Sequence, residues 1–370
     1  METETTLIHS GGRNPFGAVG TPIFATSTFT DADENGYSYT RTSNPTRTSL
    51  ENAVAAAERG SFGAAFSSGL AAEDALFSCF DKMICSGNIY GGTARLMGMS
   101  YPRTVFTDVS DEDSLESALR GTYGALVFAE TPANPLMQIT DIRRTAAIAH
   151  AHNAYLAIDN TFLSPALQNP LTLGADVCVH SATKYLGGHH DSVAGCVVTN
   201  DAKLYEKLKF AQNTKGNGLS PFESFLIKRG METLALRMKK HCENAGKVFE
   251  FLKMQREKGC GIGKIYYAGD PDSPGFSVNS AQASGGGGVI TFELSAGAVK
   301  PFIKRLRLIA FAESLGGNAS LITHPYTQTH ASLTEEEKAA RGITKGLLRL
   351  SCGTEAAVDI INDLEQAFRE

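Results

Sequence analysis

HSATKYLGGH, residues 180–189, places Lys184 directly after the hydroxyls of Ser181 and Thr183 and just before a pair of glycines. Upstream, Asp159 ends the apolar run YLAID at 155–159. Each residue alone has an ordinary interpretation: a lysine that extends to solvent from a strand end, and a buried acid. Together with their surroundings, they predict a reactive amine and a carboxylate that serve one site.

These two residue types are what pyridoxal 5′-phosphate (PLP) requires of a protein. The cofactor needs a lysine that forms a Schiff base with its aldehyde and a carboxylate that keeps its pyridine nitrogen protonated. We therefore predict that PLP is the cofactor, with Lys184 as its covalent partner and Asp159 beside its ring nitrogen. The hydroxyls that precede the lysine suit a phosphate nearby.

The length and composition indicate a soluble globular protein of about two domains. The chain has 370 residues, of which 42% are hydrophobic and 20% charged, and its formal net charge is -5. It has no block of lysine or arginine, so nucleic acid is not expected as a partner. No apolar run approaches the roughly 20 residues of a membrane span, and the acidic start METE is unlike a secretory signal. The seven cysteines include no CxxC pair, which favours reduced thiols in a cytoplasmic protein.

Three regions of the chain differ in their residue patterns. Residues 1–48 are rich in Thr, Ser, Gly and Pro, and predict an extended arm that packs on a partner subunit. Residues 49–236 alternate helical and apolar strand patterns, which predicts an α/β domain with a mostly parallel sheet buried on both faces. Residues 237–370 predict a smaller α+β domain. The large domain should contain strands at 64–67, 125–130, 155–159 and 177–181, and helices at 50–58, from 71 onward and at 142–152.

Polar residues stand where several of these strands end. Because chemistry gathers at the carboxyl ends of parallel strands, Ser68, Thr131, Asp159 and Ser181 should share one site. The small domain should contain helices at 234–251, 299–308 and 356–368, and a strand at 289–292. The four glycines at 285–288 are interpreted as a turn or strand entry, since no helix start follows them.

The motifs along the chain resemble those of the Cys/Met-metabolism family of PLP enzymes. This family includes cystathionine γ-synthase, cystathionine β- and γ-lyases, methionine γ-lyase and the O-acetylhomoserine sulfhydrylases. The resemblance runs almost end to end. It implies the aspartate-aminotransferase-like (type I) PLP fold, and a homotetramer of two dimers whose subunits share active sites. The motifs that carry it are YSYTR (37–41) with NPT (44–46), SSGLAA (67–72), YGGT (90–93), ETPANP (130–135), DNT (159–161), SATKY (181–185), ESLGG (313–317), THA (329–331) and RLSCG (349–353).

The resemblance also implies roles around the cofactor ring. Lys184 is similar to the Schiff-base lysine, whose freed amine then takes the α-proton of the substrate. Tyr90 resembles the tyrosine that stacks on the ring, and with Lys184 it is expected to be catalytic. Asp159 would pair with the ring nitrogen, and Asn134 would lie near the 3-oxygen.

The phosphate is expected to have partners from two subunits. Gly69 and Leu70 open a helix after a strand, so their N–H groups can point at an anion. Ser181 and Thr183 would add hydroxyls. The resemblance implies two further partners, which reach across to the phosphate of the neighbouring subunit: Tyr39 and Arg41 of the arm.

Arg349 resembles the arginine that clamps the substrate α-carboxylate, with Ser314 and Leu315 lining the same end. Two departures bear on the substrate. The run GGNAS at 316–320 has no acid to face a distal amine, and Tyr326 and Gln328 stand where smaller or apolar residues are usual, which weakens the case for cystathionine. In addition, Gly92 replaces the cysteine usual in methionine γ-lyases.

The resemblance implies a PLP-dependent carbon–sulfur lyase of sulfur amino acid metabolism. It would act on cystathionine or a related thioether or thiol amino acid by α,β- or α,γ-elimination, and release a thiol, an oxo acid and ammonia. Two alternatives stay open: a γ-replacement synthase, such as cystathionine γ-synthase or an O-acylhomoserine sulfhydrylase, and a silent PLP-binding scaffold. No metal site is expected, because the adjacent His189 and His190 cannot both face one ion from a strand.

Overall fold

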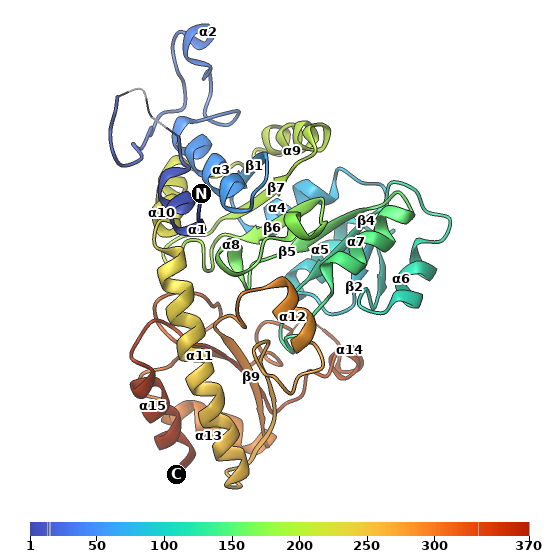
Figure 1. Ribbon diagram of the computed structural model, residues 1–370, viewed down its shortest axis with the longest axis vertical. Helices are drawn as coiled ribbons and strands as arrows, with labels where there is room; N and C mark the ends of the chain where they lie inside the picture. Colours follow the sequence, from blue (N-terminus) through green and yellow to red (C-terminus); the bar gives the residue numbers. More distant parts are fainter. Residues whose placement is uncertain (13, 15, 332, 370) are drawn as a thin grey trace.

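The computed structural model describes residues 1–12, 14, 16–331 and 333–369. Positions 13 and 15 of the expected arm, and 332 and 370 of the expected small domain, therefore lie outside the described residues. Two β-sheets organise the chain, and Figure 1 shows them one above the other with the arm projecting at the top. None of the helices described is both long and apolar enough to cross a membrane.

The upper sheet has seven strands in the order β1-β7-β6-β5-β4-β2-β3. Strands β3, β2, β4, β5 and β6 run parallel, whereas β7 is antiparallel to both β6 and β1. The mostly parallel sheet that we expected in the large domain is thus present. Its strands are β1 (Phe62–Phe66), β2 (Met83–Ser86), β3 (Val105–Thr107), β4 (Leu126–Glu130), β5 (Tyr155–Asp159), β6 (Val177–Ser181) and β7 (Gly195–Thr199).

The central strands are apolar because each of their faces meets helices. In β6, Val177 and Val179 pack into a core beneath α4 and α9, whereas Cys178 points into the core on the other side with α3, α10 and α11. Alternate side chains of a strand face opposite ways, so burial on both faces requires a continuous apolar run. The helices are α3 (Pro45–Ala57), α4 (Gly69–Phe77), α5 (Gly91–Ser100), α6 (Glu112–Leu119), α7 (Ile142–Ala151), α8 (Ser164–Leu167), a 3₁₀ turn (Pro170–Leu173), α9 (Ala202–Lys215) and α10 (Pro221–Met231).

The lower sheet has five strands in the order β10-β11-β12-β9-β8, antiparallel except for β10 and β11. Leu348 and Leu350 of β12 point into a core with α11, α13 and α15, so Arg349 between them points to the opposite face. The elements are β8 (Ile262–Tyr266), α12 (Phe276–Gln282), β9 (Val289–Leu294), α13 (Ala296–Arg305), β10 (Ala310–Phe311), β11 (Leu321–Thr323), α14 (Glu335–Ala340), β12 (Leu347–Ser351) and α15 (Ala357–Arg369).

Helix α11 (Leu234–Glu257) joins the two sheets and is longer than the expected 234–251. Its first turns bring Leu234 and Met238 into the core of the upper sheet, and its later turns bring Val248 and Leu252 into the core of the lower one. Figure 1 shows this helix running down the side of both sheets. The expected boundary at 236/237 therefore falls inside a helix.

The arm is less extended than its composition suggested. It contains α1 (Thr3–His9), whose Leu7 is fully buried, and the short α2 (Ala32–Asn35). Helix α3 already begins at Pro45, where the side chain of Asn44 caps it by accepting a hydrogen bond from Thr46 N–H. Proline at the first position of a helix costs no hydrogen bond, which explains this early start.

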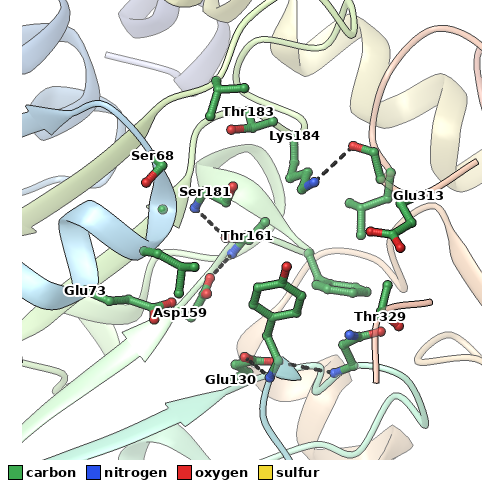
Figure 2. A pocket seen from close by; sticks show the side chains of 18 of the residues that line it. Ser68, Glu73, Glu130, Asp159, Thr161, Ser181, Thr183, Lys184, Glu313 and Thr329 are labelled. Carbon is green, nitrogen blue, oxygen red and sulfur yellow. Dashed lines mark hydrogen bonds between the residues drawn. The ribbon is translucent and has the colours of Figure 1, made fainter. Parts of the chain in front are cut away.

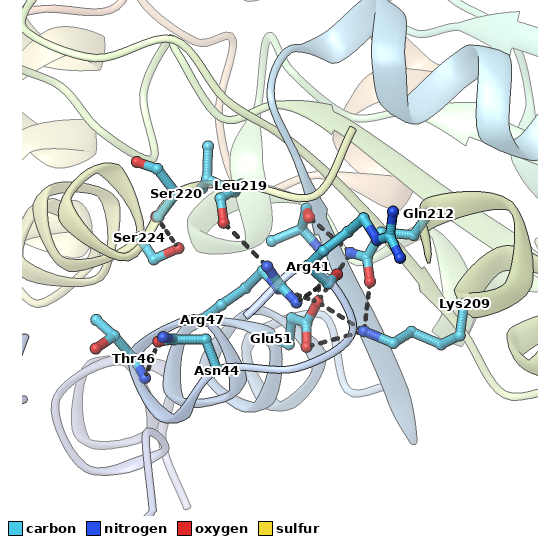
Figure 3. Close-up of polar contacts among 11 residues, drawn as sticks. Arg41, Asn44, Thr46, Arg47, Glu51, Lys209, Gln212, Leu219, Ser220 and Ser224 are labelled. Atoms are coloured by element: carbon cyan, nitrogen blue, oxygen red, sulfur yellow. Dashed lines mark hydrogen bonds and ion pairs between the residues drawn. The ribbon is translucent and has the colours of Figure 1, made fainter. Parts of the chain in front are cut away.

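Arg47 ties the root of the arm to the upper sheet domain (Figure 3). Its side chain is buried, and its two terminal nitrogens donate to the carbonyls of Leu219 (3.2 Å) and Arg41 (3.2 Å). Glu51, one turn further along α3, accepts from Gln212 Nε2 (3.1 Å) and from Ala65 N–H (3.0 Å). The arm thus has a fixed root, beyond which it leaves the body of the chain.

Candidate active site

A cavity of about 340 Å³ opens where the carboxyl ends of β4, β5 and β6 meet the start of α4 and the face of β12 that carries Arg349. Figure 2 shows side chains around it from the strand ends of the upper sheet, such as Asp159, and from a loop near the lower sheet, such as Glu313. The expected gathering of polar residues at the carboxyl ends of the strands is therefore seen for Ser68, Asp159 and Ser181. Thr131 is buried and does not line the cavity, because its hydroxyl accepts a hydrogen bond from Thr140 N–H instead. The cavity is lined by Ser68, Gly69, Leu70, Glu73, Tyr90, Glu130, Asn134, Asp159, Thr161, Phe162, Ser181, Thr183, Lys184, Val193, Glu313, Ser314, Leu315, Thr329 and Arg349.

Lys184 follows β6 in a short turn, and its amine extends into the cavity. The amine donates a hydrogen bond to Ser314 Oγ at 3.0 Å. Burial, aided by the positive charge of Arg349, lowers the pKa of Lys184 to about 8. A lysine with this pKa is partly neutral near physiological pH, as an amine must be to attack an aldehyde or accept a proton.

Asp159 is the last residue of β5, and its carboxylate faces the same cavity. It accepts a hydrogen bond from Thr161 N–H at 2.8 Å. Burial raises the pKa of Asp159, although Thr161 and the charge of His180 oppose the shift. A cation placed against this carboxyl would favour its ionised form, so the position suits a protonated ring nitrogen.

The start of α4 forms a cradle for an anion. Ser68 caps the helix by accepting from Ala71 N–H at 3.0 Å, which leaves the first N–H groups of the helix, at Gly69 and Leu70, directed at the cavity. A Cβ on Gly69 would lie 3.0 Å from the Cβ of Ser181. Glycine therefore lets the helix approach the end of β6 closely enough to form one cradle with it.

Tyr90 precedes α5, and its ring lies in the cavity with 38% of the residue exposed. Its N–H donates to Glu130 Oε1 at 2.6 Å, which fixes the backbone beneath the ring. A Cβ on Gly92 would lie 2.3 Å from Cε1 of Tyr90. A cysteine at position 92 would therefore displace this ring, which gives a physical reason for the glycine.

Arg349 is buried and reaches across from the lower sheet. Its terminal nitrogens donate to Asn134 Oδ1 (2.9 Å) and to the carbonyl of Ser314 (3.0 Å). Its buried Nε finds no hydrogen-bond partner among the described residues. An unpaired N–H of a buried guanidinium is unfavourable unless a ligand accepts from it, and a carboxylate is the matching acceptor.

Ser314 links the two cationic side chains, because its hydroxyl accepts from Lys184 and its carbonyl from Arg349. Its backbone φ of 111° lies in a region that residues other than glycine rarely adopt. Such conformations persist where the surrounding structure holds them, and they cluster at functional sites. The Thr183 hydroxyl, which the resemblance assigns to the phosphate, is bound to the backbone of Ala194. It donates to the Ala194 carbonyl at 3.1 Å and accepts from the Ala194 N–H at 3.0 Å.

Several residues of the cavity were missing from the sequence expectations. Glu313 corrects the expectation that no acid faces a distal amine of the substrate. The run 316–320 contains no acid, but the exposed carboxylate of Glu313, the residue before Ser314, lines the cavity. Its charge opposes the lowering of the pKa of both Lys184 and Arg349. Its place beside the ESLGG motif could have signalled it. The other missed residues are Glu73, Glu130, Thr161, Phe162, Val193 and Thr329.

Tyr39 and Arg41 do not line the cavity of their own chain. Tyr39 is 45% exposed, and the guanidinium of Arg41 lies 5.6 Å from the centre of its ring. Both residues belong to the arm that projects from the body in Figure 1. Both side chains are exposed.

A buried group that the sequence did not suggest could hold a metal ion: Glu58, Cys178 and His180. Glu58 is already occupied, since Oε1 pairs with His180 Nε2 at 2.6 Å and accepts from Asn160 at 2.8 Å. Burial and the charge of Glu58 raise the pKa of Cys178 well above its ordinary value, so this sulfur stays a thiol. We interpret the group as a hydrogen-bonded cluster beneath Asp159.

Comparison with known proteins agrees with this geometry. The family model for "Cys/Met metabolism PLP-dependent enzyme" matches residues 4–369. The chain is 44% identical to a cystathionine β-lyase of Lactococcus lactis, over 99% of each chain. It is 43% identical to a cystathionine γ-synthase of Haemophilus influenzae, over 99% of this chain and 97% of the other. A solved cystathionine γ-lyase of Lactobacillus plantarum, complexed with L-serine, superposes with a TM-score of 0.94 at 44% identity, over 100% of this chain and 98% of the other.

Proposed function

Because the chain belongs to the Cys/Met metabolism family of PLP-dependent enzymes, with their aspartate-aminotransferase-like fold, we propose that it is a carbon–sulfur lyase. Its substrate would be cystathionine or a related thioether or thiol amino acid, cleaved by α,β- or α,γ-elimination to a thiol, an oxo acid and ammonia. One observation carries the proposal. The amine of Lys184 lies in the same cavity as the carboxylate of Asp159 and the unpaired guanidinium nitrogen of Arg349.

The residues present fit PLP, which, when bound, serves as an electron sink for the bond that breaks at the substrate Cα. Lys184 would hold it covalently and, once released, take the α-proton. Asp159 would hold the ring nitrogen protonated, and Tyr90 would stack on the ring. The phosphate would meet the N–H groups that begin α4 and the hydroxyl of Ser181.

The substrate would be oriented by its α-carboxylate on Arg349, as the unpaired Nε indicates. Tyr90 keeps its proton at neutral pH, because burial raises its pKa. Its hydroxyl can therefore donate to a leaving sulfur atom as negative charge develops there.

Glu313 supports a substrate with a second amine. Its exposed carboxylate lies at the cavity edge and has no salt-bridge partner among the described residues. Cystathionine carries an ammonium at its far end, and a carboxylate at the rim attracts such a group. Replacement of Glu313 by Gln should therefore lower kcat/KM for cystathionine more than for S-methylcysteine, which lacks the distal ammonium.

Product analysis tests the proposal. The PLP-loaded enzyme would be incubated separately with cystathionine, cysteine, homocysteine and methionine, and both oxo acid and thiol would be measured. We expect equal amounts of the two from at least one of these substrates. No oxo acid from any of them would contradict a lyase.

A γ-replacement synthase is the second candidate, favoured by the 43% identity to a cystathionine γ-synthase. An O-acylhomoserine supplied with cysteine separates the two functions. A synthase would form cystathionine from these two substrates without releasing oxo acid, whereas a lyase would not form cystathionine.

We also propose that the enzyme is a cytoplasmic homotetramer of two site-sharing dimers, in which Tyr39 and Arg41 reach the phosphate of the neighbouring subunit. The support is that both residues are exposed and do not line the cavity of their own chain, and that the arm also exposes Phe16 (75%) and Val19 (108%). All seven cysteines lie in the described part of the chain as free thiols, which suits a reducing compartment.

Subunit complementation tests the shared site. Arg41→Ala subunits would be mixed with Lys184→Ala subunits, each inactive or nearly so alone. Hybrid dimers should regain one site with native Arg41 and native Lys184 from different chains. If subunits exchange and activity does not return, the arm serves its own chain.

A further inference from the structure

Three carboxyl groups meet at one end of the cavity. Asp159 and Glu130 are paired neighbours at the ends of the parallel strands β5 and β4. The preceding residues, Ile158 and Ala129, point into the core on the other face, so both acids point to the side where α4 packs. Glu73 comes from α4, four residues after Gly69, so it lies on the cavity face of that helix.

Glu73 is the acid among them without an evident function. Only 4% of the residue is exposed, yet it lines the cavity, and Figure 2 shows its carboxyl turned toward that of Asp159. Its Oε2 is buried and finds no hydrogen-bond partner among the described residues. Glu130, in contrast, accepts from the N–H groups of Tyr90 at 2.6 Å and Asn134 at 3.5 Å.

Among the described residues, the ionisable groups that act on Glu73 from the neighbouring elements, or on which it acts, are all acids. They are Asp159 of β5, Glu130 of β4, Cys85 of β2 and Tyr90 before α5. Burial and the charge of Asp159 also raise the pKa of Glu130, to about 8. Burial and then the charge of Asp159 raise the pKa of Glu73 well above its ordinary value, against a smaller opposing effect of the Thr93 hydroxyl. Two adjacent buried carboxyls without a cation between them cannot both ionise at neutral pH.

We propose that Glu73 is held as an uncharged carboxylic acid beside Asp159, and that its O–H supports the Asp159 carboxylate at the end of the cavity that receives the ring nitrogen of PLP. The inference rests on the proposed placement of the cofactor. Glu73 would be a positioning residue that acts through Asp159: the pair carries one negative charge, which matches one protonated ring nitrogen. A second ionised carboxylate would leave an unbalanced buried charge.

Two substitutions separate this function from simple packing. Glu73→Gln keeps the shape and a hydrogen-bond donor without charge, and so imitates the protonated acid. Glu73→Met keeps a similar volume but offers no donor. Glu116→Gln, on the exposed face of α6, is the matched control.

The first measurement uses the protein without PLP. Infrared spectra at pH 7 should show the C=O stretch of protonated carboxyls, with Glu130 as a second contributor, and its intensity should fall in both Glu73 variants but not in Glu116→Gln. Between pH 5 and pH 7, the unfolding constant of the wild-type protein should rise up to tenfold per pH unit relative to Glu73→Gln. The sign follows because the folded state holds a proton that the unfolded state has released, so stability falls as pH rises.

The second measurement is the dissociation constant of PLP from the apoenzyme. Glu73→Gln should bind PLP within about threefold of wild type, whereas Glu73→Met should bind roughly 10- to 150-fold more weakly, the range for losing a hydrogen bond to a charged group. If the infrared band keeps its full intensity in both variants, or if Gln weakens binding as much as Met, the inference is wrong. Should Glu73→Gln not fold, the fall in band intensity from wild type to Glu73→Met still tests the inference.

The two proposals fail separately. A missing infrared band overturns the uncharged Glu73 and leaves cofactor attachment at Lys184 untouched. Attachment of PLP to another lysine overturns the proposed function and leaves the measurements on the cofactor-free protein as they stand.

Discussion

Replacement of Arg349 by Lys should weaken the grip on the substrate α-carboxylate while the positive charge stays in place. In the structure, the guanidinium is already held by Asn134 Oδ1 and the carbonyl of Ser314, and its Nε still has a proton to donate. A lysine amine presents a point charge in place of this planar set of donors.

The size of the effect follows from the number of hydrogen bonds lost. We expect the variant to lose one charge-assisted hydrogen bond to the substrate, which contributes about 1.5–3 kcal/mol. At 1.4 kcal/mol per factor of ten, kcat/KM should fall roughly 10- to 150-fold. The measurement is steady-state oxo acid release with cystathionine, beside Arg143→Lys on the exposed face of α7 as a matched control.

A substrate analogue makes the test specific. The amine that corresponds to the substrate without its α-carboxylate should bind wild type and Arg349→Lys with nearly equal inhibition constants, because the lost contact is absent in both. If the variant loses as much affinity for this amine as for a carboxylate-bearing inhibitor, Arg349 does not hold the carboxylate. Its effect would then be on the shape of the cavity.

Three further predictions concern the cofactor. Borohydride reduction of the PLP-loaded enzyme should label Lys184, and Lys184→Ala should be inactive yet still bind some PLP; a label on any other lysine would contradict the assignment. Because the pKa of Lys184 is lowered to about 8, the rate of PLP attachment to the apoenzyme should rise with pH and level off above about 8, whereas an ordinary lysine would continue to gain neutral amine up to pH 10. Gly92→Ala should weaken PLP binding, because its Cβ would meet the Tyr90 ring, whereas Gly98→Ala in the same helix has open space and should bind PLP normally; equal binding by both would show that the ring position does not matter.

The order of strands and helices was partly predictable from local pattern. The strands at 155–159 and 177–181 have the expected bounds, since both are short apolar runs between helices. Strand β7 was missed because it returns antiparallel to β6 after a loop, without the intervening helix that announces a parallel strand. The first turn of α3 was missed because Asn44 and Pro45 resemble a loop until the cap and the missing proline N–H are considered together.

Site residues were predictable where they belong to a recognisable motif. They were not predictable where their chemical role depends only on neighbours that the fold brings together. Lys184, Asp159 and Arg349 stand in recognisable motifs, and the structure brings all three to one cavity. Glu73 lies inside a helical pattern, where an acid normally faces water. Its significance depends on Asp159 and Glu130, which are far away in sequence and adjacent only in the fold.

Helix α11 has a mechanical consequence for the whole enzyme. Its 24 residues form a rod of about 36 Å that is embedded at one end in the core that carries Lys184 and at the other in the core that carries Arg349. Neither sheet can move away from the other without separating one end of α11 from its core. The length of helix α11 therefore helps to set the distance between Arg349, which binds the substrate carboxylate, and Lys184, which reacts with the substrate.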